Sequence, residues 1–219
     1  MVPGRVFETT GHQRLKRARA LHSQQQWMRK TNMGHHLILG ELEDYLTGEI
    51  LADTADERFR QEIARLLVAE KGYGRAEIAA RRKLPVNAGP NSAVVPVDFV
   101  VSLQGRICMV VRFGPGSVVT RQRSTLAAAR LIAGQRIPVV VVTNGQTADI
   151  LDGTTGKRIG EGLAAVPRRS ELAQMAERHR FEPISTERLE KEARIVYAFE
   201  VDGACPCDDT ICRMDPSKT

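Results

Sequence analysis

The stretch from Val94 to Gly134 constrains the fold of this chain more than any other. It contains the apolar run VVPVDFVVSL, a turn at QGR, a second apolar run ICMVVRF and the loop GPG. Two apolar runs joined by a short turn predict a β-hairpin inside a sheet. Asp98 is the one charged residue in the first run. Because ionised carboxylates are rarely buried without a partner or a metal, Asp98 is the first candidate for a functional residue.

The segments on either side of this hairpin predict helices and strands in an alternating order. Thr54 and Glu57 form a capping-box pattern, and the apolar spacing after them predicts a helix that ends before Gly72. Residues 37–51 predict only a short segment that packs on the core. The further expected helices are 120–134, one after Arg168, and 186–199.

Strands are expected over 79–86, 137–143 and 148–151. The first of them carries Arg81, Arg82 and Lys83, which places it at a sheet edge, where cations discourage further strand pairing. The second is a continuous β-branched run and is therefore expected to be covered on both faces. Together the elements predict an α/β fold with a mixed central sheet flanked by helices.

Composition and charge divide the chain into four parts. With 219 residues, 42% hydrophobic and 26% charged, the chain can bury one sizeable core. Residues 1–36 hold seven cations against the single acid Glu8, a net charge of +6 that equals the charge of the whole chain. The expected organisation is a basic arm over 1–36, a sheet domain over 37–165, helices over 166–202 and a cysteine-containing tail over 203–219.

The basic arm and the absence of long apolar runs give expectations about partners and location. An arm rich in arginine suits phosphate contacts, although disordered leaders and transit peptides have the same composition, and the arm could lie outside the native protein. No apolar run is long enough to cross a bilayer and no secretory signal begins the sequence. We therefore expect a soluble, cytoplasmic protein that does not bind membranes.

Six short motifs, taken in order, resemble one known family. They are Thr47-Gly48-Glu49, Glu57-Arg58-Phe59-Arg60-Gln61, Glu70-Lys71-Gly72-Tyr73, Val97-Asp98-Phe99-Val100-Val101, Gly114-Pro115-Gly116 and Val142-Thr143-Asn144-Gly145. This pattern, over roughly residues 45 to 165, resembles the N-terminal nuclease domain of type I restriction enzyme R subunits, within the PD-(D/E)xK nuclease superfamily. The resemblance implies a restriction-endonuclease-like core.

The resemblance also implies a Mg²⁺ site. An Asp and the Glu of an E-x-K strand would bind the metal, which prefers several oxygen ligands, while the Lys would assist the attacking water. Asp98 matches the metal aspartate and Glu57 matches the helical acid. In place of Glu-x-Lys, however, the sequence reads Val111-Arg112-Phe113.

This departure predicts a degenerate nuclease centre. Strand side chains alternate, so the face that would carry Glu and Lys is apolar here, and Arg112 points the other way unless the register shifts. A guanidinium can stabilise a phosphorane, but it cannot replace a metal carboxylate and is a poor base. Arg112 would then be a vestigial or rearranged member of the site together with Asp98 and Glu57. We therefore favour a relative that binds DNA without cutting it.

Two other functions remain open from the sequence. In an active endonuclease, Asp98, Glu57 or Glu62, and an arginine would supply the site, with Mg²⁺ as the cofactor. In a structural module, the chain would bind a protein partner or a second copy of itself. For the favoured DNA-binding function, the candidate phosphate contacts are Arg81, Arg112, Arg121 and Arg123, each of which could instead be solvated at the surface. Asp98 beside a second carboxylate would indicate catalysis, whereas Asp98 paired to an arginine would indicate a lost site.

The cysteines give a separate and weaker expectation. Cys205, Cys207 and Cys212 have C-x-C-x4-C spacing, which can wrap a soft metal with a fourth ligand from Asp208, a histidine or another chain. An unstructured, reducible tail is the more common outcome for three cysteines. Cys108 falls in a core strand, where it is expected to act as a small buried hydrophobe. No other cofactor is expected.

Overall fold

The computed structural model describes residues 37–202 and 212–214. The chain divides into two compact units, Met1–Leu37 and Ile38–Thr219, and every helix and strand below belongs to the second. The predicted basic arm and most of the cysteine-containing tail lie outside the described residues. Within the described part, no helix is long and apolar enough to span a membrane.

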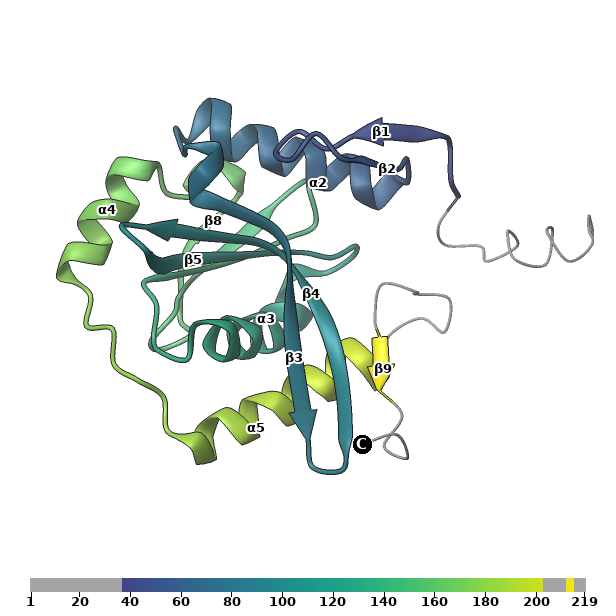
Figure 1. The fold of residues 1–219 in the computed structure, drawn as a ribbon. Helices are drawn as coiled ribbons and strands as arrows, with labels where there is room; N and C mark the ends of the chain where they lie inside the picture. The colour runs from purple at the N-terminus through teal and green to yellow at the C-terminus, as the bar shows by residue number, and fades with distance from the viewer. Residues whose placement is uncertain (1–36, 203–211, 215–219) are drawn as a thin grey trace, which may run out of the picture. The chain divides into compact units, whose positions relative to one another are not determined.

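A seven-stranded mixed sheet forms the centre of the second unit (Figure 1). Six strands follow the chain in the order β3-β4-β5-β6-β7-β8, and β9 pairs with β4. Only β5 and β6 pair in parallel; all other pairs are antiparallel. The predicted mixed α/β fold is confirmed, and so is the edge position of the arginine-rich strand β3. The strands are β3 (Ile78–Ala88), β4 (Asn91–Leu103), β5 (Arg106–Phe113), β6 (Val139–Thr143), β7 (Ala148–Asp152), β8 (Arg158–Glu161) and β9 (Cys212–Met214).

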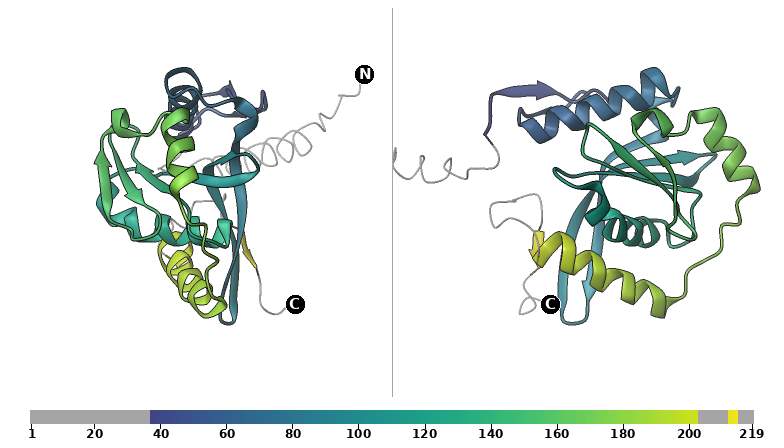
Figure 2. Two further views of the ribbon diagram at one scale, coloured as in Figure 1. Left: turned by 90° about the vertical axis from the view of Figure 1, so that its left-hand side faces the viewer. Right: turned by 180° about the vertical axis from the view of Figure 1, so that it is seen from behind.

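Helices cover both faces of this sheet (Figure 1, Figure 2). One face packs against α2 (Ala55–Arg65), its π-helical continuation η1 (Leu66–Glu70) and α4 (Arg169–Arg178). The other face packs against α3 (Val118–Ala133), α5 (Thr186–Val196) and the π-helical turn η4 (Tyr197–Asp202). Two short 3₁₀ turns also belong to this unit, η2 (Arg75–Glu77) and η3 (Leu163–Ala165).

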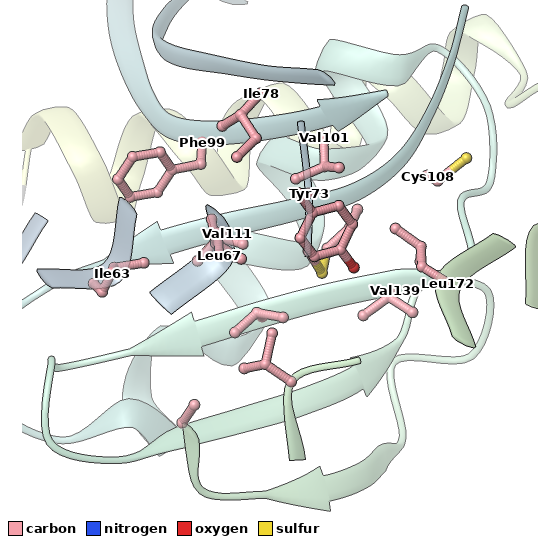
Figure 3. Packing of buried hydrophobic residues seen from close by; sticks show 14 of the residues in the cluster. Ile63, Leu67, Tyr73, Ile78, Phe99, Val101, Cys108, Val111, Val139 and Leu172 are labelled. Carbon is pink, nitrogen blue, oxygen red and sulfur yellow. The ribbon is translucent and has the colours of Figure 1, made fainter. Parts of the chain in front are cut away.

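Two buried clusters lie on the two faces because the strand side chains alternate. Along β6, Val139 and Val141 belong to the first cluster, and Val140 and Val142 belong to the second. This explains the continuous β-branched run, since both faces are covered. Figure 3 shows part of the first cluster around the Tyr73 ring. Cys108 also belongs to it and is almost fully buried, as predicted.

The antiparallel pairing of β4 with β5 ends at Phe99 and Val111. Nearer the N-terminal end of β4, Ser92–Val94 pair with β9. Because β3 occupies the opposite edge of β4 along almost its full length, β5 and β9 must share the remaining edge. Residues 95–98 of that edge therefore pair with neither strand. Asp98 lies at this opening.

A small antiparallel hairpin precedes the main sheet in the sequence. It consists of β1 (Glu41–Glu43) and β2 (Ile50–Ala52). The sequence predicted only a short packing segment here, because strands of three residues that contain acids give no clear alternation. The predicted cap of α2 is confirmed: the Thr54 hydroxyl accepts a hydrogen bond from the Glu57 amide at 3.1 Å.

Candidate functional site

Asp98 is buried and forms contacts with two arginines. Its Oδ1 accepts a hydrogen bond from Arg60 Nε at 2.7 Å, and its Oδ2 accepts one from the Phe113 amide at 2.9 Å. Arg112 Nε lies 3.5 Å from the same Oδ2. The carboxylate at the centre of the predicted site is thus neutralised by two cations, the arrangement that we associated with a lost site.

Arg112 reaches away from the apolar face of β5, as alternation predicted. Its Nη2 donates to Glu200 Oε2 at 2.8 Å, and both side chains are about nine-tenths buried. Met109, Val111 and Phe113 belong to the first hydrophobic cluster on the other face. Arg112 therefore bridges Asp98 of the sheet to an acid in η4.

Glu57 lies at the start of α2 and also holds arginines. Its Oε1 accepts from Gln61 Nε2 at 2.9 Å and from Arg81 Nη1 at 3.2 Å, and its Oε2 lies 3.5 Å from Arg60 Nη1. The carboxylate thus binds these side chains instead of returning to the Thr54 amide as a capping box would. Glu62, the alternative acid, is exposed and forms no ion pair in the described part of the chain.

Arg81 connects Glu57 to a further acid. The Arg81 backbone has a left-handed φ of 48°, which is uncommon for an arginine. The residue interrupts the β3–β4 register between Ala80–Phe99 and Arg82–Val97. Its Nη2 lies 2.5 Å from Asp44 Oδ2.

Asp44 and Arg60 have shifted pKa values. Burial would raise the pKa of the Asp44 carboxyl, but hydrogen bonds from Arg81, the Thr47 amide and Gln61 outweigh it and lower the pKa from 3.8 to about 2. Burial opposes the charge on Arg60, yet the attraction of Asp98 and Glu57 raises the pKa of its guanidinium.

These contacts form one chain of alternating charges, which we call the charge chain. Four carboxylates and three guanidinium groups follow one another from the β1–β2 hairpin to η4. Each guanidinium of the charge chain lies between two acids, so each of its three cations has a partner. Its members in order are Asp44, Arg81, Glu57, Arg60, Asp98, Arg112 and Glu200.

Phe113 lies at the position where the resemblance predicts the lysine of an E-x-K motif. It is 5% exposed, and its ring stacks on Phe59 with 5.7 Å between centroids. The guanidinium carbon of Arg60 lies 5.2 Å from the centroid of the same ring. Val111, at the glutamate position, is 1% exposed. Packed hydrocarbon therefore occupies both positions at which the resemblance predicts polar groups.

Two glycines of the family-like motifs have steric roles beside the site. A Cβ on Gly145 would lie 2.3 Å from the Phe59 ring, and Gly145 has a φ of +85°. A Cβ on Gly114 would lie 2.7 Å from the Arg121 guanidinium. These motif positions therefore allow α2 and α3 to approach the strand ends.

The four predicted phosphate contacts differ in their partners. Arg81 and Arg112 belong to the charge chain. Arg123 donates to the fully buried Glu192 at 2.5 Å, together with Arg130 and Arg188. Within the described residues, Arg121 has no acidic partner.

The predicted cysteine site cannot be located. Cys205 and Cys207 lie outside the described residues, and only the backbone of Cys212 is described, opposite Val94 in β9. Across residues 37–202, no group of three histidine, cysteine or acidic side chains is arranged to hold a metal ion.

A family model described as type I restriction enzyme R protein N terminus matches residues 55–167. The chain belongs to this family. No curated protein and no solved structure gives a match. The match extends from the first helix of the domain to the segment before α4, so it includes Glu57, Asp98 and the whole of β5. The family resemblance predicted from the motifs is confirmed.

Sequence reasoning named Arg112 beside Asp98, but it missed Arg60, which also binds Asp98, and Glu200, which binds Arg112. Arg60 lies inside the motif Glu57–Gln61, but its spacing on a helix gave no reason to connect it with a strand 38 residues later. Glu200 lies outside the resemblance, and its one signal is an acid within the apolar stretch YAFEV. Asp44 had no separate signal.

Proposed function

We propose that this member of the restriction enzyme R N-terminal family binds duplex DNA and does not cut it. The observation that carries the proposal is the pairing of Asp98 with Arg60 and Arg112, at a centre where Val111 and Phe113 replace the expected polar pair. Family membership supports a nuclease-related role. The contacts of Asp98 argue against metal-dependent cleavage.

The residues present do not fit a Mg²⁺ ion. Magnesium requires several oxygen ligands in octahedral geometry. Both oxygens of Asp98 already bind hydrogen-bond donors, and both oxygens of Glu57 contact cations. A metal ion would have to displace Arg60 or Arg112 and come close to the positive charge that remained.

Displacing these arginines would also destabilise the domain. Removing one partner of a buried ion pair typically costs about 3 to 5 kcal/mol, because the other charge is left uncompensated. Asp98 and Arg112 are both about nine-tenths buried. The charge chain is therefore a structural replacement for a catalytic centre.

For the DNA contact, the unpaired Arg121 is a stronger candidate than the other three predicted arginines. Arg81, Arg112 and Arg123 each bind a carboxylate that would repel a phosphate and compete with it. Arg121 lies over Gly114, at the start of α3, and no acidic side chain among residues 37–202 pairs with it. A cationic side chain that neutralises a phosphate releases a counterion condensed on the DNA, and this release drives binding.

A plasmid-nicking assay and a gel-shift assay test the two parts of this proposal. We expect the wild-type chain to leave supercoiled plasmid intact in Mg²⁺ or Mn²⁺ and to shift a short duplex. Arg121→Gln should weaken that shift, whereas Arg178→Gln should change it little, because Arg178 is an exposed residue of α4 that forms no ion pair with any described residue.

Metal-dependent nicking that disappears in Asp98→Asn would overturn the non-cleaving assignment in favour of an active endonuclease. A wild-type chain that neither shifts nor nicks duplex would overturn the DNA-binding part and favour the protein-interaction module. Thermal unfolding of each variant checks that a loss of binding does not reflect a loss of fold.

A further inference from the structure

Tyr45 holds two arginines at a place separate from the charge chain. The guanidinium carbon of Arg75 lies 4.4 Å from the ring centroid, and that of Arg65 lies 5.5 Å from it. The two guanidinium carbons can therefore be no farther apart than the sum of these distances, about 10 Å. Both arginines are exposed, and neither has an acidic partner within residues 37–202.

The ring that holds them is fixed in place. Tyr45 lies in the turn between β1 and β2, and its amide donates to Gln61 Oε1 at 2.7 Å. The neighbouring amides of Leu46 and Thr47 donate to the buried Asp44 at 2.8 and 2.7 Å. The Tyr45 side chain also packs against the first hydrophobic cluster. The Tyr45 ring is therefore already held in position before a ligand binds.

The missing counter-charge distinguishes this pair from the arginines around it. Arg58, Arg60 and Arg81 all bind carboxylates, and so does Arg169 of α4, which holds Glu77 of η2. Two uncompensated guanidinium groups on one ring repel each other, and an anion that contacts both would relieve that repulsion.

The contact of the two guanidinium groups with the Tyr45 ring suits a phosphate ligand. An arginine whose face lies over an aromatic ring keeps its N–H groups free at the edge of the guanidinium plane, where they can bind two phosphate oxygens together. Arg65 ends α2 and Arg75 begins η2, so the two side chains approach the ring from different elements.

We propose that Arg65, Arg75 and Tyr45 form a binding site for backbone phosphates of duplex DNA. This inference depends on the DNA-binding function proposed above and adds a contact surface to it. Tyr45 positions the two arginines, and the arginines contact the phosphates. The surface is independent of Asp98 and requires no metal.

The test is a salt titration of the full chain with a fluorescently labelled duplex, followed by anisotropy. Each phosphate contact contributes about 0.9 to the slope of the logarithm of the binding constant against the logarithm of salt concentration. We expect the slope to become shallower by about 2 in Arg65→Gln/Arg75→Gln. The control Arg178→Gln/Arg194→Gln also removes two exposed charges that have no acidic partner in the described part of the chain, and it should keep the wild-type slope.

A third variant tests the role of the ring. Tyr45→Leu keeps an apolar side chain against the cluster and removes the aromatic face, so its melting temperature should stay near that of the wild type while its affinity falls. Equal slopes in the wild type and the arginine double variant would overturn this inference alone. An equal decrease of the slope in the control variant would indicate a general charge effect and would also overturn the inference. A wild type that does not bind duplex would contradict both proposals.

Discussion

Asp44 is buried and accepts four hydrogen bonds from protein groups. The amides of Leu46 and Thr47 donate to its Oδ1, and Gln61 and Arg81 donate to its Oδ2. Burial alone would raise the pKa of this carboxyl, but these donors lower it from 3.8 to about 2. The folded-state pKa lies below the unfolded value, so the carboxylate stabilises the fold above pH 4. That stability is lost as the pH falls toward 2.

We therefore expect the advantage of the wild type over Asp44→Asn to depend on pH. The difference in their free energies of unfolding should shrink by about 1 kcal/mol between pH 6 and pH 3, because part of the wild-type carboxyl is protonated on unfolding at pH 3. Urea denaturation at several pH values measures it. A difference that stays constant over this range would show that Asp44 does not titrate as its contacts imply.

At the same scale, Asp98 shows what a sequence can and cannot identify. One acid inside an apolar strand was enough to predict a buried, partnered carboxylate. That Arg60 would bind it depended on how α2 packs against the sheet, and nothing local to Arg60 encodes that packing. The same holds for Gly145. The sequence showed its motif, but the need for a glycine comes from tertiary packing, because the Phe59 ring leaves no room for a Cβ there.

At the scale of elements, α3 and α5 are joined through one acid. Glu192 is fully buried and contacts Arg123, Arg130 and Arg188. Burial would raise the pKa of its carboxyl, but the hydrogen bonds and charges of Arg123 and Arg130 lower it. Apolar residues of both helices belong to the second cluster, so this ion group lies beside a hydrophobic contact.

Glu192→Gln should therefore destabilise the protein by about 3 kcal/mol, because it leaves clustered guanidinium charges uncompensated. Urea denaturation at pH 7 measures the change. Glu190→Gln, on the same helix but exposed and unpaired, should change stability by less than about 0.5 kcal/mol. Equal small effects in both variants would mean that Glu192 contributes no more than a surface charge.

Elements with a strong hydrophobic period were predictable, and short polar ones were not. The observed α3, Val118–Ala133, lies within two residues of the predicted helix and ends at Gly134 in a left-handed conformation, as a C-cap. The strands β1 and β2 escaped prediction because three residues cannot establish alternation. β9 pairs with β4 from within the cysteine-containing tail, where no strand was expected.

At the scale of the whole molecule, the family match and the folded unit cover different ranges of residues. The match ends at residue 167, close to the end of the predicted sheet domain at 165. Both hydrophobic clusters nevertheless include residues beyond that point: Leu172 in the first, and Val196 and Val201 in the second, all fully buried. The C-terminal helices therefore complete the two cores and supply Glu192 and Glu200 to the ion groups.

A fragment comparison tests this dependence. Fragment 38–165 should lose cooperative unfolding, because one side of each cluster would be exposed to water, whereas fragment 38–202 should keep it. Circular dichroism during urea denaturation is the suitable measurement, since the single tryptophan, Trp27, lies outside both fragments. Fragment 38–202 also lacks β9, so a transition as steep as that of the full chain would show that β9 adds little to cooperativity. A cooperative transition in fragment 38–165 would instead mean that the family domain folds without α4 and α5, and that the charge chain can lose Glu200 without loss of the fold.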